Sequence, residues 1–214
     1  MKAGYVPRFS GAERLLHWVN ALGFFFLLAT GLILYLPRLS VLVSRRQLIQ
    51  SLHFWAGVGW LGALALVVVL GGRRLLATAR ELDTFDDDDI RWLRGKRAPQ
   101  GRFNAGQKIN AALTAAFTIL FGVSGLLLWF GEQDTRLRFA STVILHDGLM
   151  YVSLALLAGH LYLALIHPAT RHALRGMTLG DVRADWAVKH HRKWEPEGFR
   201  SDWGERQRAA GKPQ

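Results

Sequence analysis

The chain has 214 residues, half of them hydrophobic, and a formal net charge of +11. It contains no cysteine, which excludes disulfides, thioether-attached heme and iron–sulfur clusters held by this chain's own thiolates. The length predicts a single domain, 1–214, but the apolar residues gather in four long runs instead of spreading as in a soluble core. We therefore expect a membrane protein, with no nucleic-acid partner.

The four runs are near the ~20 residues that a helix needs to cross lipid, and they lack the period-two alternation of membrane β-strands. The runs lie at about residues 17–36, 53–71, 110–130 and 146–166. They predict an all-α membrane protein, a four-transmembrane-helix bundle. With flanking residues, the helices are expected at about 13–36, 51–72, 106–130 and 144–168, followed by a basic tail over 169–214.

The basic residues favour one side of the membrane. Of the 27 Lys and Arg, 22 precede the first helix, follow the fourth, or lie in the 71–109 connection. Because short segments rich in Lys and Arg stay in the cytoplasm, both termini are expected there, in a bacterial cytoplasmic (inner) membrane with anionic lipid. Within the connection, the run Asp86–Asp89 predicts a solvated charged segment instead of a metal site.

Four histidines lie in or beside the apolar runs. His146 and His160 are 14 residues apart, so they lie on nearly one helix face, about 21 Å apart along the axis. In the predicted orientation His53 and His146 share the outer half of the membrane, and His17 and His160 share the inner half. The two pairs predict that the bundle binds two b-type hemes, an outer one and an inner one, each with its iron held by two histidines. Such sites suit electron transfer, because no open iron position remains.

Other interpretations of the histidines stay open. A single histidine at a helix end is often a hydrogen-bonded polar residue, whereas one deep in lipid, such as His160, is by default functional. His167 is the rival ligand of the inner site, but it precedes Pro168 at the expected interface. Three further histidines are expected at the surface of the basic tail: His172, His190 and His191.

The residues before the third run suit a quinone. Asn104 and Gln107 supply amide donors and acceptors on the expected inner side, beside an apolar helix. The same pair fits a helix capping box, with Asn at N-cap and Gln at N3, and spacing does not separate these interpretations.

The glycines of the second and third runs also allow two interpretations. They either make room for a flat macrocycle or let helices pack closely. These glycines are Gly57, Gly59, Gly62, Gly122 and Gly125. No internal repeat is expected.

These residues together resemble the cytochrome b (gamma) subunit of membrane-bound, quinone-linked formate dehydrogenase, over about residues 8–194. The matching motifs are Arg14-x-x-His17-Trp18, the Phe103-Asn-Ala-Gly-Gln-Lys108 run, His146, His160-x-Tyr162 and the Trp186-Ala-x-Lys-His-His191 tail. The histidine–tryptophan start is shared with diheme subunits of nickel–iron hydrogenases, whereas the Asn-Ala-Gly-Gln-Lys run and the tail are more specific to the formate branch.

The resemblance implies an electron-transfer subunit within an oxidoreductase complex. In such a complex an alpha subunit holding molybdenum or tungsten oxidises formate, and an iron–sulfur beta subunit passes electrons to the outer heme on the periplasmic side. The gamma subunit then reduces menaquinone or ubiquinone near the cytoplasm, and Asn104, Gly106 and Gln107 would line the quinone pocket. Such heterotrimers can also assemble further.

Two alternative functions stay open. The chain could serve a nickel–iron hydrogenase or another molybdoenzyme as its diheme cytochrome b subunit. It could also be a heme-free membrane anchor or transporter, whose histidines relay protons or bind a substrate.

Overall fold

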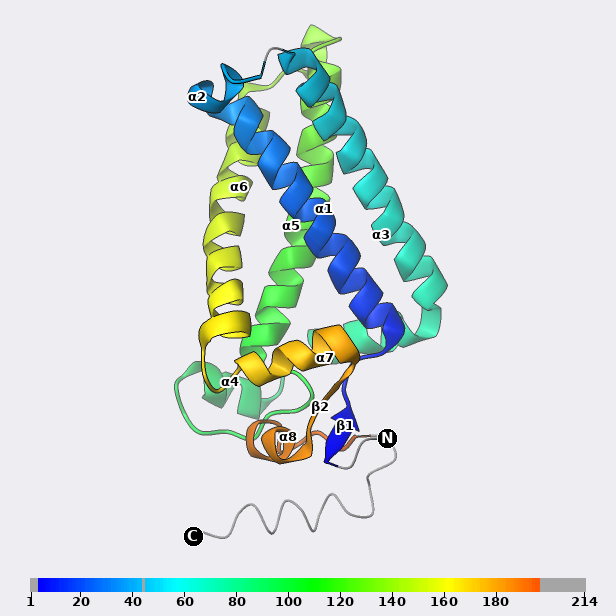
Figure 1. The fold of residues 1–214 in the computed structure, drawn as a ribbon, viewed down its shortest axis with the longest axis vertical. Helices are drawn as coiled ribbons and strands as arrows, with labels where there is room; N and C mark the ends of the chain where they lie inside the picture. Colours follow the sequence, from blue (N-terminus) through cyan, green and yellow to red (C-terminus); the bar gives the residue numbers. More distant parts are fainter. Residues whose placement is uncertain (1–3, 44, 197–214) are drawn as a thin grey trace. The chain divides into compact units, whose positions relative to one another are not determined.

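A computed structural model describes residues 4–43 and 45–196 of the chain (Figure 1). Four helices in this part are long and apolar enough to cross a membrane, with a mean hydropathy of 1.8 to 2.1 over their most apolar stretches. They are α1 (Gly11–Tyr35), α3 (Arg46–Asp83), α5 (Ala105–Gly131) and α6 (Ala140–Leu161). The predicted all-α membrane fold with four transmembrane helices is confirmed.

The remaining elements are short. The two strands are β1 (Tyr5–Pro7) and β2 (Asp181–Arg183), and the short α-helices are α2 (Pro37–Ser40), α4 (Asp87–Leu93), α7 (Leu174–Leu179) and α8 (Ala184–His190). Two 3-10 turns, η1 (Thr135–Leu137) and η3 (Arg171–Ala173), and one π-helical turn, η2 (Tyr162–Ile166), complete the order. Trp203 and the rest of the predicted tail beyond residue 196 lie outside the described residues.

The second transmembrane helix differs from its predicted span of 51–72. It begins at Arg46 and continues to Asp83, but Gly72 has φ 46° and ψ −127°, which is not helical. A residue with a Cβ rarely adopts a positive φ, so glycine is required where the helix is interrupted. The apolar segment therefore ends at Gly72, as predicted, and a second helical segment follows it.

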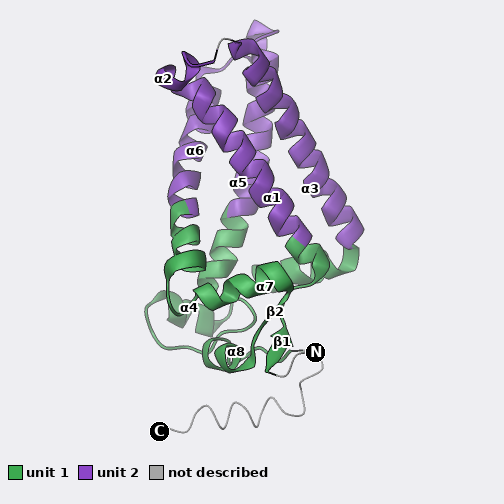
Figure 2. Ribbon diagram, viewed as in Figure 1, with its two compact units in different colours: residues 1–14, 72–113, 158–214 green, residues 15–71, 114–157 purple. Residues whose placement is uncertain are grey.

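The chain forms two compact units, coloured separately in Figure 2. Unit 1 combines Met1–Arg14, Gly72–Leu113 and Ala158–Gln214, and unit 2 combines Leu15–Gly71 and Thr114–Leu157. The predicted single domain, 1–214, stays a prediction.

Unit 1 has a core built from the two ends of the described chain. Strands β1 and β2 pair antiparallel, with Val6 opposite Val182. Both side chains are fully buried, and they share one hydrophobic cluster with residues of α8 and with Trp194. The described part of the tail therefore packs on the chain's own N-terminal segment.

Unit 2 keeps its large apolar side chains on the outside. Leu22, Val69, Leu70 and Ile144 are each more than 60 % exposed, which in water would be costly and in lipid is favourable. Its helices are held together by close contacts such as the stacked rings of Phe54 and Trp129, whose centroids are 4.1 Å apart. Unit 2 is thus built for hydrocarbon surroundings.

Gly180 supports the fold of unit 1 and provides a direct test of it. It ends α7 with φ 92°, its carbonyl accepts hydrogen bonds from the backbone N–H groups of Arg8 and Phe9, and an added Cβ would lie 3.0 Å from the Phe9 carbonyl oxygen. Gly180→Ala should lower the free energy of unfolding by about 1–3 kcal/mol, measured by chemical unfolding in detergent. Gly11→Ala is the control, because an added Cβ there meets nothing within 4 Å. Equal stability of the two variants would show that unit 1 does not depend on the backbone conformation of Gly180.

Candidate functional site

A cavity of about 420 Å³ lies within unit 2. Its wall is mostly apolar, and His53 of α3 and His146 of α6 both contribute to it. Apolar pockets with a few placed polar groups are the usual surroundings of small ligands and cofactors. The structure therefore brings the predicted outer pair of histidines together in one cavity.

The two imidazole rings are spaced as ligands of one metal ion would be. Their centroids are 6.4 Å apart, and their planes make an angle of 74°. A metal–imidazole nitrogen bond is about 2 Å long and the nitrogen lies roughly 1 Å from the ring centre, so two rings on opposite sides of one ion have centroids about 6 Å apart. The spacing of His53 and His146 is thus compatible with both imidazoles binding one metal ion.

Two glycines lie beside the rings. A Cβ added at Gly31 would lie 3.4 Å from Cε1 of His53, and one added at Gly125 would lie 3.7 Å from Cε1 of His146, which are ordinary van der Waals distances. Both glycines line the cavity, so a Cβ at either would take up part of the room that a flat group needs. Gly122 also lets two helices pack closely, because an added Cβ would lie 2.9 Å from Leu61 of the neighbouring helix.

Two of the predicted glycines neither line the cavity nor lie where an added Cβ would meet a neighbouring helix. Gly59 and Gly62 do not line the cavity, and a Cβ added at either would meet nothing within 4 Å. Neither making room for a cofactor nor close packing explains them. Gly57 does line the cavity.

Each imidazole in the cavity is hydrogen-bonded by a hydroxyl group that sequence reasoning missed. Nδ1 of His53 lies 2.8 Å from Oγ1 of Thr30, and Nδ1 of His146 lies 2.8 Å from Oγ of Ser124. The signal was present as a short repeat: Thr30-Gly-Leu-Ile-Leu in α1 matches Ser124-Gly-Leu-Leu-Leu in α5.

The predicted inner pair is divided between the two units. His17 lies on α1 in unit 2, with its ring edge-on to Trp18 at 5.3 Å. His160 lies in the last turn of α6, in unit 1, directly before the π-helical turn η2. The rival ligand, His167, ends η2 and lies 3.3 Å from the Thr170 hydroxyl. The pairing of His17 with His160 stays a prediction.

The predicted quinone residues lie at the start of α5, in unit 1. The Asn104 Oδ1 atom accepts a hydrogen bond of 2.9 Å from the Gln107 backbone N–H, and Gln107 Oε1 accepts one of 3.0 Å from the Asn104 backbone N–H. This reciprocal pair is a capping box. A Cβ added at Gly106 would lie 3.2 Å from the Trp92 ring, so that glycine lets α4 approach. The box engages both amide oxygens and neither amide nitrogen.

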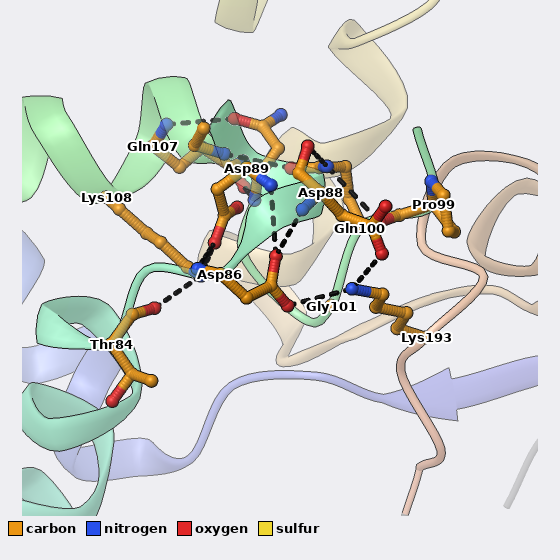
Figure 3. A network of polar contacts seen from close by, with 12 residues as sticks. Thr84, Asp86, Asp88, Asp89, Pro99, Gln100, Gly101, Gln107, Lys108 and Lys193 are labelled. Atoms are coloured by element: carbon orange, nitrogen blue, oxygen red, sulfur yellow. Dashed lines mark hydrogen bonds and ion pairs between the residues drawn. The ribbon is translucent and has the colours of Figure 1, made fainter. Parts of the chain in front are cut away.

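Only the first half of the acidic run beside this helix start is the solvated segment that was predicted, because Asp86 and Asp87 are exposed. Asp88 and Asp89 are buried, 8 % and 2 % exposed, and Asp86 caps α4 (Figure 3). The Asp89 carboxylate lies 2.6 Å from Lys108 Nζ, and Lys193 reaches the run from the tail. Because burying an unpaired charge is costly, the run is stabilised by these ion pairs. It fixes the connection to the start of α5.

Lys108 lies in the first turn of α5 and contacts the preceding connection twice. Its ammonium group, 10 % exposed at the side chain, donates to the Asp89 carboxylate and, at 2.8 Å, to the Thr84 carbonyl. The residue therefore holds α5 against the preceding connection.

A buried arginine lies beside the predicted quinone residues. Arg8 is 3 % exposed, donates to the Arg102 carbonyl at 2.8 Å and lies 3.5 Å from Gln107 Oε1. Burial, with the nearby positive charge of Arg102, lowers the pKa of Arg8 to about 9. Its guanidinium carbon lies 5.2 Å from the Trp186 ring centroid, a distance typical of cation–π contacts.

His191 is buried, which corrects its predicted surface position. It is 2 % exposed, and its Nδ1 lies 2.6 Å from the Gly101 carbonyl oxygen. His172 is exposed as predicted, and the His190 ring stacks on Trp186 at 5.1 Å. The second histidine of this motif, His191, therefore has a structural role, because it joins the tail to the residues before α5.

Apolar helices of spanning length, with two imidazoles in one apolar cavity, are the features expected of a helical membrane protein of the b-cytochrome class. A model of the prokaryotic cytochrome b561 family matches residues 8–180, and the chain belongs to this family. It has the membrane electron-transfer role of a b-type cytochrome.

The curated relatives are subunits of one kind of enzyme complex. The chain is 27 % identical over 208 residues to the formate dehydrogenase cytochrome b556(fdo) subunit of Escherichia coli K12, covering 90 % of this chain and 92 % of that one. It is 24 % identical over 212 residues to the nitrate-inducible cytochrome b556(Fdn) subunit of the same strain, covering 92 % and 93 %. It is 22 % identical over 200 residues to the formate dehydrogenase cytochrome b556 subunit of Haemophilus influenzae, covering 86 % of this chain and 79 % of that one. The similarity to formate dehydrogenase cytochrome b subunits is confirmed.

The buried imidazole of His191 predicts a pH dependence of stability. Burial, with the nearby charge of Arg8, lowers the pKa of His191 to about 3, whereas an unfolded histidine titrates near about 6.5. Between these values the unfolded state binds more protons, so this contribution to stability is complete above about pH 6.5 and is lost as the pH falls. The free energy of unfolding should therefore be about 2 kcal/mol lower at pH 5 than at pH 7.

His191→Gln should reduce this loss, measured by urea unfolding in detergent at both pH values. His172→Gln, at an exposed histidine of the same segment, is the control and should keep the wild-type slope. An unchanged slope in His191→Gln would show that other groups carry the pH dependence.

Proposed function

We propose that this chain is the membrane electron-transfer subunit of a formate dehydrogenase, which carries electrons through two b hemes and reduces quinone. The observation that carries the proposal is the facing pair His53 and His146, with ring centroids 6.4 Å apart in an apolar cavity. The family, whose name is that of a b-type cytochrome, and the relatives, named as formate dehydrogenase subunits, support it. Heme iron, when bound, supplies reversible one-electron oxidation and reduction.

At the outer site, His53 and His146 would each give one imidazole nitrogen to the iron. Two protein ligands leave no iron position for oxygen or substrate, so the site would transfer electrons without chemistry on a bound molecule. The apolar wall excludes water. At the inner site we propose the pair His17 and His160, on the basis of their depth in the predicted orientation.

The proposed direction of electron flow follows from the charge distribution of the sequence. The Lys and Arg residues are concentrated in the N-terminal segment, the 71–109 connection and the tail. Because such segments stay in the cytoplasm, both termini would lie on the cytoplasmic side of a bacterial inner membrane. An iron–sulfur (beta) subunit on the periplasmic side would deliver electrons that a molybdenum or tungsten (alpha) subunit takes from formate. Moving one electron inward, against a potential that is negative inside, costs about 2.3 kcal/mol per 100 mV of membrane potential. The reaction would therefore conserve energy as membrane potential.

Quinone would be reduced beside Asn104, Gly106 and Gln107 at the start of α5. The capping box uses the amide oxygens of Asn104 and Gln107, and the amide N–H groups are the donors that a quinone carbonyl needs. Capping and binding are therefore compatible: the box fixes the side chains that would donate. Menaquinone and ubiquinone both present such carbonyls.

The histidine assignment is tested with variants in the assembled, purified complex. His146→Ala should remove one heme, by pyridine hemochrome assay, and abolish heme reduction by formate because the entry site is lost. His160→Ala should also leave one heme, which formate still reduces, while quinone reduction falls to background. If both variants retained two low-spin hemes, the pairing would be wrong, and His167 would become the inner candidate.

The quinone assignment is tested by a substitution that preserves the cap. Asn104→Asp keeps the acceptor for the Gln107 N–H and removes the amide donor, so helix stability should stay while the Kd of a quinone analogue rises about tenfold, as for loss of one hydrogen bond. Asn104→Ala removes both functions and should also cost about 1 kcal/mol of stability. Unchanged analogue binding in Asn104→Asp, with intact heme content, would leave Asn104 with a capping role only.

The partner is tested by identifying the subunits that co-purify with the chain from membranes. An iron–sulfur subunit and a formate-oxidising molybdenum or tungsten subunit are expected. Recovery of a nickel–iron hydrogenase instead would keep the electron-transfer role and reject formate as the source of electrons.

A further inference from the structure

We propose that Thr30 and Ser124 are positioning residues that set the tautomer and the ring orientation of His53 and His146. The inference rests on the proposed heme function and concerns how this chain prepares its own ligands. Each hydroxyl lies 2.8 Å from Nδ1 of its histidine, which leaves Nε2 as the ring nitrogen for iron. Neither residue was a candidate from the sequence.

The proton positions follow from the partners of each hydroxyl. Thr30 Oγ1 lies 3.0 Å from the Phe26 carbonyl and 3.1 Å from the Leu27 carbonyl, so its single proton has backbone acceptors. Once that proton is donated, the oxygen can only accept from Nδ1–H of His53. The imidazole is then neutral with a lone pair on Nε2, which is the form that binds a metal.

Ser124 repeats this arrangement on another helix. Its Oγ lies 2.6 Å from the Leu120 carbonyl and 3.3 Å from the Phe121 carbonyl, again three and four residues back along the same helix. The two hydroxyl residues are buried, with Thr30 6 % and Ser124 0 % exposed, so water does not compete for these bonds. Each is followed by the glycine that faces the same histidine, Gly31 or Gly125.

This pairing of a hydroxyl with the next glycine gives each histidine two constraints. The hydroxyl fixes the ring through Nδ1, and the glycine after it brings the helix backbone close to Cε1, where even a Cβ would already touch the ring. In hydrocarbon an unpaired N–H is costly, so the Nδ1 proton needs an internal acceptor. The short repeat in α1 and α5 is thus explained as one structural device used twice, once for each ligand of the outer site.

The device should affect the redox behaviour of the outer heme. A hydrogen bond from Nδ1–H makes the imidazole a stronger donor to iron, and such partners outside the ligand set commonly change metal affinity by about 10–100-fold when removed. A stronger donor stabilises the oxidised iron. Loss of either hydroxyl should therefore weaken heme retention and move the midpoint potential of the outer heme to a more positive value.

The test uses the purified complex and four variants. Thr30→Val and Ser124→Ala remove the hydroxyls, and Thr30→Ser restores one in a smaller side chain. Thr118→Val is the matched control, because the Thr118 hydroxyl also donates to a carbonyl four residues back, at 2.8 Å, and its hydrogen bond is exposed. Redox titration of the heme bands and heme retention during dilution in detergent are the measurements.

Thr30→Val and Ser124→Ala should each shift the outer potential upward and weaken heme retention about 10–100-fold, while the inner heme keeps its wild-type potential. Thr30→Ser and Thr118→Val should behave as wild type. If the midpoint potential of the outer heme stayed at the wild-type value in both hydroxyl-free variants, with two hemes present, this inference would be wrong and the proposed function would stand. A wild-type complex that holds no heme would instead reject the proposed function.

Discussion

The imidazoles of His53 and His146 face one another across 6.4 Å inside an apolar wall, and most features of unit 2 can be understood from this pair. A polar ring in hydrocarbon needs a partner for each nitrogen, since no water is present to provide one. Hydroxyls at Thr30 and Ser124 meet Nδ1, and the proposed iron would meet Nε2. The hydroxyl shared by the matching segments of α1 and α5 follows from that requirement.

Unit 1 follows a different rule, because its charged side chains are buried against protein. Asp89 is paired with Lys108, and the carboxylate of Glu13 lies 2.7 Å from the Arg102 guanidinium. Breaking one partner of a buried pair typically costs about 3–5 kcal/mol, so these pairs constrain where the start of α5 can lie. The proposed quinone residues are part of that start. Their position therefore depends on these ion pairs.

Much of the fold could be predicted from the sequence because the membrane imposes a simple pattern. Apolar runs of spanning length predicted all four long helices, and the break of α3 at Gly72 coincides with the end of the second run. The His53–His146 pair could be predicted because helix direction and depth are enough to bring two residues together. Nothing in local pattern, by contrast, distinguishes Thr30 from any other hydroxyl on an apolar helix until the histidine beside it is known.

The errors share one physical cause: they concern contacts between segments distant in sequence. Asp88 and Asp89 were expected in solvent because four aspartates in a row are usually solvated, but Lys108 and Lys193 reach them from elsewhere. His191 was placed on the surface, yet it is buried and bonded to the Gly101 carbonyl.

The central claim, a paired imidazole ligand set at two depths of the membrane, is tested most directly by counting heme in the purified wild-type complex. Pyridine hemochrome assay combined with quantitative amino-acid analysis gives moles of heme b per mole of this polypeptide. We expect two, both low-spin in the oxidised protein. One heme or none per chain would contradict the claim.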